Sequence, residues 1–206
     1  RSMTVRNIHD TIRFNSGRSV VEFVEKHFAK TLLVELDFDT KRSVEDCITS
    51  AYIITDIKSR QAELMQSGCT AVTCLIKKES DGVRYLYSAN VGDSRAVLSR
   101  KGKASRLSED HKASDNTEKH RVEELGGFVL RDRVLGMLAV SRAFGDHNLK
   151  RFVSARPYIT KTKLHGDEEF LIVACDGLWD EVSDEDAAKI VRDTYYKSDK
   201  NEQKAA

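Results

Sequence analysis

The sequence TAVTCLIKKESDGVRYLYSANVGDSRAVLS, residues 70–99, decides the fold. Two runs rich in β-branched and aromatic residues, 70–76 and 83–91, flank the turn signal Ser80-Asp81-Gly82, which is typical of a β-hairpin. Gly92-Asp93-Ser94 interrupts this pattern, and a further strand follows it directly. The stretch therefore predicts a meander of antiparallel strands.

Helical patterns lie on both sides of this meander. Apolar residues recur at three- and four-residue steps over residues 19–33, and again after Ser43, whose side chain can cap a helix that runs to about residue 63. Residues 115–125 and the residues after Ser183 predict two further helices. Residues 170–175 are continuously apolar, which is typical of a strand covered on both faces. Together these elements predict an α+β fold.

The composition of the 206 residues predicts one compact domain over 1–206. Hydrophobic residues make up 40% and charged residues 33%, and a net charge of +1 gives no overall field that favours nucleic acid or a membrane surface. No apolar run is long enough to cross a bilayer, and the first residues lack the apolar stretch of a signal peptide. We expect a soluble intracellular protein, cytoplasmic or nuclear, with no nucleic acid or membrane partner.

The cysteines and histidines give no sign of a metal site of their own. No short metal-ligand spacing links the cysteines, which predicts reduced, structural thiols at Cys47, Cys69, Cys74 and Cys175. Polar contexts predict positions at the surface or in the flap for His111, His120, His147 and His165.

Acidic residues follow several of the predicted strands. Asp176 comes directly after the most apolar strand, with Asp180 four residues later, and Asp93 leaves another strand next to a glycine. Carboxylate clusters suit hard cations such as Mg²⁺ or Mn²⁺. A third acidic loop at Asp146 could converge with them. The alternative is that these carboxylates accept backbone hydrogen bonds in turns and caps, with Asp93 paired to Arg95.

Six motifs, in this order, resemble the signature motifs of the metal-dependent type 2C serine/threonine protein phosphatases: SGCTAV at 67–72, ANVGDSRAV at 89–97, LSEDHK at 107–112, EELGGFV at 123–129, LAVSRAFGD at 138–146 and CDGLWD at 175–180. The similarity runs from about Arg18 to Asp193. It implies a sandwich of two antiparallel β-sheets flanked by helices (α-β-β-α). It also implies a metal centre at one end of the sandwich and a small flap beside it, over residues 112–147.

The resemblance also implies the site residues. Asp176 matches the aspartate of the core metal centre, and Asp93 and Asp180 match the residues that join it around an additional, weaker metal ion. A complete domain would hold two core Mg²⁺ or Mn²⁺ ions. The early motif of the family, with a phosphate-binding arginine and a metal-side acid, is represented at best by Arg6 and Asp10.

Four departures from the family pattern concern catalysis. His9 stands where a glutamate is expected, and Arg6 is not at the family spacing. The family has Asp-Gly-His-Gly-Gly before its first long helix, whereas this chain has Arg13-Phe14-Asn15-Ser16-Gly17, without carboxylate or histidine. The family's late Asp-Asn motif follows the last helix, and no Asp-Asn pair follows the last predicted helix within the 206 residues. We therefore assign no catalytic residue, expect core strands to be missing at both ends, and expect no phosphatase activity from these residues alone.

Two hypotheses follow for the parent protein. In the first, it removes phosphate from phosphoserine and phosphothreonine of phosphoprotein substrates by in-line attack of metal-activated water. In the second, the domain is a pseudophosphatase, a phosphatase-like protein-binding or regulatory module without catalysis. The end of the 206 residues within a helical pattern favours omitted sequence, whereas His9 in place of a glutamate favours degeneration.

Overall fold

The computed structural model describes residues 14–15, 18–38 and 41–197. The candidate site residues Arg6 and Asp10, together with His9, lie outside this part of the chain. The structure therefore tests the expectations for the sandwich, the flap region and the later acidic residues.

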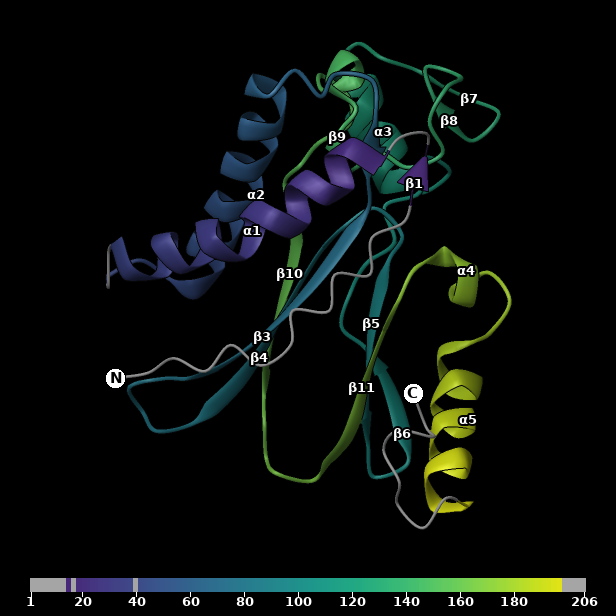
Figure 1. Ribbon diagram of the computed structural model, residues 1–206. Helices are drawn as coiled ribbons and strands as arrows, with labels where there is room; N and C mark the ends of the chain where they lie inside the picture. The colour runs from purple at the N-terminus through teal and green to yellow at the C-terminus, as the bar shows by residue number, and fades with distance from the viewer. Residues whose placement is uncertain (1–13, 16–17, 39–40, 198–206) are drawn as a thin grey trace.

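Two three-stranded antiparallel sheets form the centre of the molecule (Figure 1). The first sheet has the order β10-β4-β3, with β3 at Ala71–Lys78, β4 at Arg84–Val91 and β10 at Tyr158–Lys163. The second has the order β11-β5-β6, with β5 at Arg95–Arg100, β6 at Lys103–Arg106 and β11 at Glu168–Ala174. Both sheets carry side chains that alternate between their two faces.

The predicted meander is wrong at one point. Strands β4 and β5 follow each other in the sequence but belong to different sheets. Gly92 lies between them with φ +84°, a conformation that glycine adopts readily, and the chain passes here from one sheet to the other. The loop that carries Asp93 is therefore a crossing between layers rather than a hairpin turn.

Helices cover the outer faces of both sheets, as the α-β-β-α expectation requires. Helices α1 (Arg18–Phe38) and α2 (Val44–Gln61) pack on the first sheet, where Tyr87 and Ala89 lie in their shared core. The short helix α4 (Asp176–Trp179) and helix α5 (Asp184–Lys197) pack on the second, against Val97. Figure 1 shows the two groups of helices on opposite sides of the sheets. This confirms the predicted fold class.

The space between the sheets is filled by apolar side chains of both layers. Val72 and Leu86 of the first sheet pack with Ala96 and Leu98 of the second, and all four are buried. Because side chains alternate along a strand, their neighbours Ala71 and Val97 face the helices instead. Successive residues of a strand thus point alternately into the core between the sheets and into a core beneath the helices.

Helix α2 begins as its sequence predicts. Ser43 is the N-cap, and its Oγ accepts a hydrogen bond from the Asp46 backbone N–H at 3.0 Å while donating to the Asp46 carboxylate at 2.7 Å.

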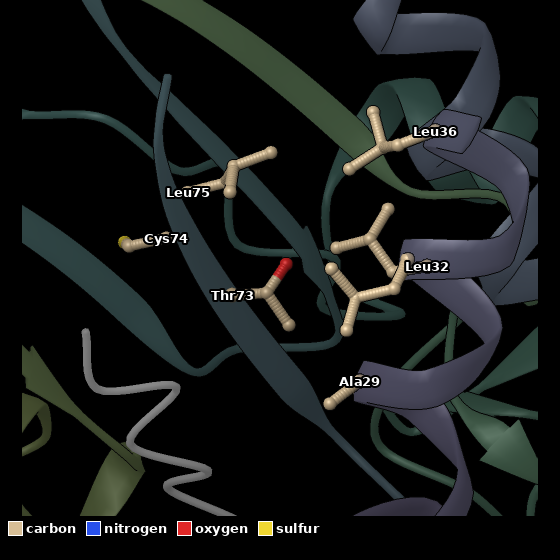
Figure 2. Close-up of a pocket in the computed structure, with 7 residues that line it drawn as sticks. Ala29, Leu32, Leu36, Thr73, Cys74 and Leu75 are labelled. Atoms are coloured by element: carbon tan, nitrogen blue, oxygen red, sulfur yellow. The ribbon is translucent and has the colours of Figure 1, made fainter. Parts of the chain in front are cut away.

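An apolar pocket lies between helix α1 and strand β3. Figure 2 shows Leu32 and Leu36 pointing from the helix towards Thr73 and Leu75.

Small elements complete the end of the sandwich near Asp93. The short strands β1 (Phe14–Asn15), β2 (Gly68–Cys69) and β9 (Phe144–Gly145) form a sheet of their own. Beyond it come helix α3 (Asn116–Glu124), the hairpin β7 (Val129–Leu130) and β8 (Arg133–Val134), and the 3₁₀ turn η1 (His147–Leu149). Buried side chains from Ala113 to Val153 form a separate hydrophobic cluster in this region. The expected flap over 112–147 falls within these residues, and its bounds stay a prediction.

Strand β11 differs from its expectation. Its apolar residues 171–174 are half-buried rather than covered on both faces. Within the described residues β11 lies at the edge of its sheet and pairs with β5, so no strand protects its other side there.

No helix of the described residues is long and apolar enough to span a membrane.

Candidate metal centre

Asp93 lies in the loop that crosses from β4 to β5. A Cβ atom on the preceding Gly92 would stand 2.2 Å from the Thr70 Cγ2 atom, so the loop packs against Thr70 where only glycine fits. The hydroxyl groups of Thr70 and Ser94 lie 2.8 Å apart, within hydrogen-bond distance. The position of Asp93 is thereby fixed from both sides.

Asp176 and Asp180 lie at the two ends of helix α4, which follows strand β11. Asp176 is its first residue, and the Asp180 backbone N–H donates to the Asp176 carbonyl at 2.8 Å. Trp179 is buried, and its indole N–H donates to the Ala174 carbonyl at 2.8 Å, which ties the helix to the end of the strand. Trp179 is thus the core anchor beneath the two aspartates.

The pairing of β5 with β11 brings Asp93 and Asp176 to the same end of one sheet. In this antiparallel ladder Arg95 is opposite Ala174. Asp93 lies two residues before Arg95 and Asp176 two residues after Ala174, so both continue from the same end of the paired strands. Burial raises the pKa of the Asp93 carboxyl, the neighbouring Asp176 carboxylate raises it further, and the Lys112 ammonium opposes both effects. Two carboxylates therefore share one partly buried site.

Asp180 lies nearer the solvent. Its side chain is 53% exposed and forms an ion pair with the Lys112 ammonium at 3.2 Å. Since Lys112 also acts on Asp93, this lysine supplies positive charge to both acidic loops. The alternative pairing of Asp93 with Arg95 is wrong, because the Arg95 guanidinium pairs with Asp110 and Asp184.

The chemistry of these donors fits a hard divalent cation. Burying two facing carboxylates is costly without a compensating positive charge, and carboxylate oxygens are the ligands that Mg²⁺ and Mn²⁺ prefer. Within residues 14–15, 18–38 and 41–197, no group of three or more His, Cys, Asp and Glu side chains is arranged to hold a metal ion.

The third acidic loop lies in another environment. The Asp146 carboxylate packs over Gly68, where a Cβ atom would stand 1.9 Å from Asp146 Oδ2. Burial raises the pKa of Asp146, the Lys150 ammonium lowers it, and Asp56 raises it. These charges belong to helix α2 and the end of the η1 turn, so the expected convergence of Asp146 with Asp93 and Asp176 is not found.

Two of the histidines expected at the surface or in the flap are buried, His111 and His147. The His111 Nδ1–H donates to the Gly92 carbonyl at 3.1 Å, and burial lowers the pKa of the ring to about 4. His147 Nε2 lies 2.9 Å from the Ser59 hydroxyl. His111 supports the loop that carries Asp93, and its place in the LSEDHK motif is the sequence signal that indicates such a role.

The comparisons with known proteins agree with this architecture. The family model described as protein phosphatase 2C matches residues 6–206. Protein phosphatase 2C homolog 1 of Schizosaccharomyces pombe is 42% identical over 183 residues, which are 86% of this chain and 52% of that protein. Protein phosphatase 2C homolog 1 of Saccharomyces cerevisiae is 38% identical over 191 residues, 87% of this chain and 68% of that protein.

Solved structures show the same fold. A phosphatase from a pathogenic strain of Toxoplasma gondii superposes with a TM-score of 0.81 at 21% identity, covering 95% of this chain and 76% of the other. A sex-determining protein of C. elegans gives 0.78 at 27% identity, covering 88% of this chain and 46% of the other. The chain spans about half to two thirds of the length of the curated relatives named above. With a family model that matches almost all of its residues, the chain belongs to the protein phosphatase 2C family.

Proposed function

We propose that the protein containing this chain is a Mg²⁺- or Mn²⁺-dependent protein phosphatase that acts on phosphoserine and phosphothreonine. Membership of the protein phosphatase 2C family supports protein phosphatase activity in general. The observation that supports the proposal for this chain is the register of β5 and β11, since it brings Asp93 and Asp176 to the same end of one sheet.

The residues have distinct roles in this proposal. Asp176 and Asp93 would hold a cation directly or through water, and Asp180 would join them when its ion pair with Lys112 opens. A bound Mg²⁺ or Mn²⁺ would supply positive charge to the phosphoryl oxygens and lower the pKa of the attacking water. Arg6 and Asp10 stay predictions as the phosphate-binding and metal-side residues.

The reaction is a hydrolysis. Water attacks the phosphorus in line, the bond to the serine or threonine oxygen breaks, and a proton given up by the water ends on that oxygen, so the products are the free hydroxyl and inorganic phosphate. No cysteine is needed as nucleophile, and burial raises the pKa of the Cys74 thiol to about 11, which keeps it neutral. The substrates are phosphoproteins, and the intracellular location expected from the sequence stays a prediction.

A second candidate is a binding or regulatory module without catalysis. Two observations favour it: no three-ligand group occurs among the described residues, and no carboxylate occurs in Arg13-Phe14-Asn15-Ser16-Gly17. In that case the acidic loops would keep their fold, and the full-length protein would bind phosphoproteins without releasing phosphate.

Phosphate release from a phosphothreonine peptide by the full-length protein separates the two candidates. We expect release that requires Mn²⁺ and that falls to background in Asp176→Asn. Asp37→Asn, which alters an exposed carboxylate on helix α1, is the matched control and keeps wild-type activity. Metal-independent release would contradict the proposed mechanism, and no release from a folded full-length protein would favour the binding module.

A further inference from the structure

A network of four charged side chains lies beneath the acidic loops. The Arg95 guanidinium donates from Nε and Nη2 to the Asp110 carboxylate at 2.8 and 2.6 Å, and from Nη1 to Asp184 at 3.2 Å. Arg106 Nε donates to the other Asp184 oxygen at 2.6 Å. The side chains of Arg95, Asp110 and Asp184 are 12%, 15% and 11% exposed, so water screens these contacts weakly.

The network joins the segments that carry the candidate ligands. Arg95 is two residues beyond Asp93, and Asp110 is two residues before Lys112, the partner of Asp180. Asp184 is four residues beyond Asp180 and begins helix α5. A single guanidinium therefore connects the β4–β5 loop, the loop after β6 and the segment after α4.

Arg95 also contacts the anchor of helix α4. Its Cζ atom lies 5.7 Å from the centre of the Trp179 ring, a cation–π distance. Since Trp179 holds α4 to the end of β11, Arg95 touches the element that carries Asp176 and Asp180 as well as the loop that carries Asp93. Bidentate arginine–carboxylate pairs fix direction as well as distance.

We propose that Arg95 is a positioning residue for the candidate metal centre, setting the placement of Asp93 against Asp176 and Asp180 without touching the cation. The inference rests on the proposed function, because it concerns the same site. It adds a residue whose loss weakens cation binding through geometry alone. Partners that orient metal ligands cost about 10- to 100-fold in metal affinity when they are removed.

The sign of the effect distinguishes geometry from charge. Replacing Arg95 by glutamine removes a positive charge near the acidic loops and leaves Asp110 and Asp184 with less compensation. By Coulomb attraction alone this change strengthens the binding of a divalent cation. A positioning role predicts the opposite, because Asp93 loses its fixed distance from Asp176.

A matched control lies on the same strand. Arg100, at the other end of β5, forms a similar bidentate pair with Asp167, at 2.5 Å from Nε and 3.1 Å from Nη2. Arg100→Gln thus removes a bidentate ion pair from the same element, away from the acidic loops. The side chains of this pair are 37% and 32% exposed, so thermal unfolding measured in parallel corrects for the difference in burial. Arg95→Lys keeps the charge but cannot form the bidentate pair, and it tests geometry a second way.

The experiment is Mn²⁺ binding to the full-length protein, followed by electron paramagnetic resonance, with thermal unfolding measured in parallel. Wild type is expected to bind Mn²⁺ in an Asp176-dependent manner. Arg95→Gln and Arg95→Lys are expected to bind about tenfold or more weakly, and Arg100→Gln within about twofold of wild type.

Four outcomes would overturn the inference. Unchanged or tighter binding by Arg95→Gln shows that charge dominates, and wild-type affinity in Arg95→Lys shows that the bidentate geometry is dispensable. An equal loss in Arg100→Gln shows general destabilisation. Equal Mn²⁺ affinity in wild type and Asp176→Asn would contradict the proposed site itself, and with it this inference. The first three outcomes contradict only the role of Arg95. If Arg95→Gln is unfolded at the assay temperature, Arg95→Lys decides.

Discussion

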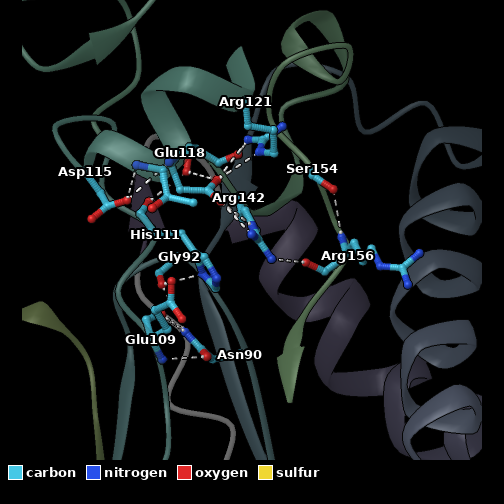
Figure 3. A network of polar contacts seen from close by, with 12 residues as sticks. Asn90, Gly92, Glu109, His111, Asp115, Glu118, Arg121, Arg142, Ser154 and Arg156 are labelled. Atoms are coloured by element: carbon cyan, nitrogen blue, oxygen red, sulfur yellow. Dashed lines mark hydrogen bonds and ion pairs between the residues drawn. The ribbon is translucent and has the colours of Figure 1, made fainter. Parts of the chain in front are cut away.

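Arg142 and Glu118 form an ion pair inside the flap region, where the Arg142 guanidinium donates to Glu118 Oε1 from Nε at 3.1 Å and from Nη2 at 2.5 Å. The Glu118 side chain is 2% exposed and also accepts hydrogen bonds from Arg121 and from the Ser141 hydroxyl. Figure 3 shows Glu118 and Arg121 of helix α3 together with Arg142 from the segment before β9. The carboxylate therefore holds helix α3 to the segment that leads into β9.

Glu118→Gln tests the energetic importance of this carboxylate. The amide leaves Arg121 and Arg142 without their shared anion and places N–H donors against guanidinium groups. Removing one partner of a buried ion pair costs about 3–5 kcal/mol, and we expect a loss of this order in the free energy of unfolding, measured by urea denaturation. Glu124→Gln, on the same helix and paired with His120 at the surface, is the control and changes stability by less than about 1 kcal/mol. Equal losses in both variants would contradict this account.

The buried His111 makes stability depend on pH. Burial lowers its pKa to about 4, whereas an unfolded histidine has a pKa of about 6.5. The unfolded state therefore binds the proton more readily. The stabilising effect of the neutral ring is fully present above about pH 6.5 and is lost progressively as the pH falls towards 4.

His111→Asn should reduce this dependence, because asparagine has no titratable group and can still donate to the Gly92 carbonyl. His147 contributes to the same slope, since burial also lowers its pKa, so the slope should become shallower without vanishing. Chemical denaturation at pH 7 and pH 5 measures the difference. A slope that is identical in wild type and His111→Asn would show that His111 does not titrate as proposed.

Gly92→Ala is expected to destabilise the fold and displace Asp93. Its Cβ would stand 2.2 Å from Thr70, and its φ of +84° is unfavourable for alanine. Gly166→Ala is the matched control, because Gly166 has a φ of +92° but nothing within 4 Å of an added Cβ. The difference in thermal unfolding isolates the clash, which we expect to cost about 1–3 kcal/mol beyond the control. Similar melting temperatures for the two variants would argue against close packing at Thr70.

The local parts of the fold could be predicted from the sequence. Strands β3 and β4 follow from β-branched residues around a turn signal, and the start of helix α2 follows from Ser43 and Asp46. The change of sheet after β4 could not be predicted, because a glycine with positive φ does not determine which strand pairs next. The local sequence encodes the turn, and long-range pairing determines the layer.

The candidate site shows the same division. Asp93 and Asp176 were recognisable as acids at strand ends, but their approach depends on the pairing of β5 with β11. Strand β6, helix α3 and strands β7 to β10 separate these two strands in the sequence. The burial of Glu118 could not be predicted, since its partner Arg142 is 24 residues away. Charged side chains are buried when partners compensate them, and those partners are set by tertiary structure.

The most direct test of the account is the dissociation constant for Mn²⁺ of the full-length protein and of its Asp93→Asn and Asp176→Asn variants. Both carboxylates are proposed to serve one site, so each substitution should weaken Mn²⁺ binding by about tenfold or more, while the exposed control Asp37→Asn leaves it unchanged. Dissociation constants that stay at the wild-type value in both Asp93→Asn and Asp176→Asn would contradict the central claim that these two residues form the metal centre.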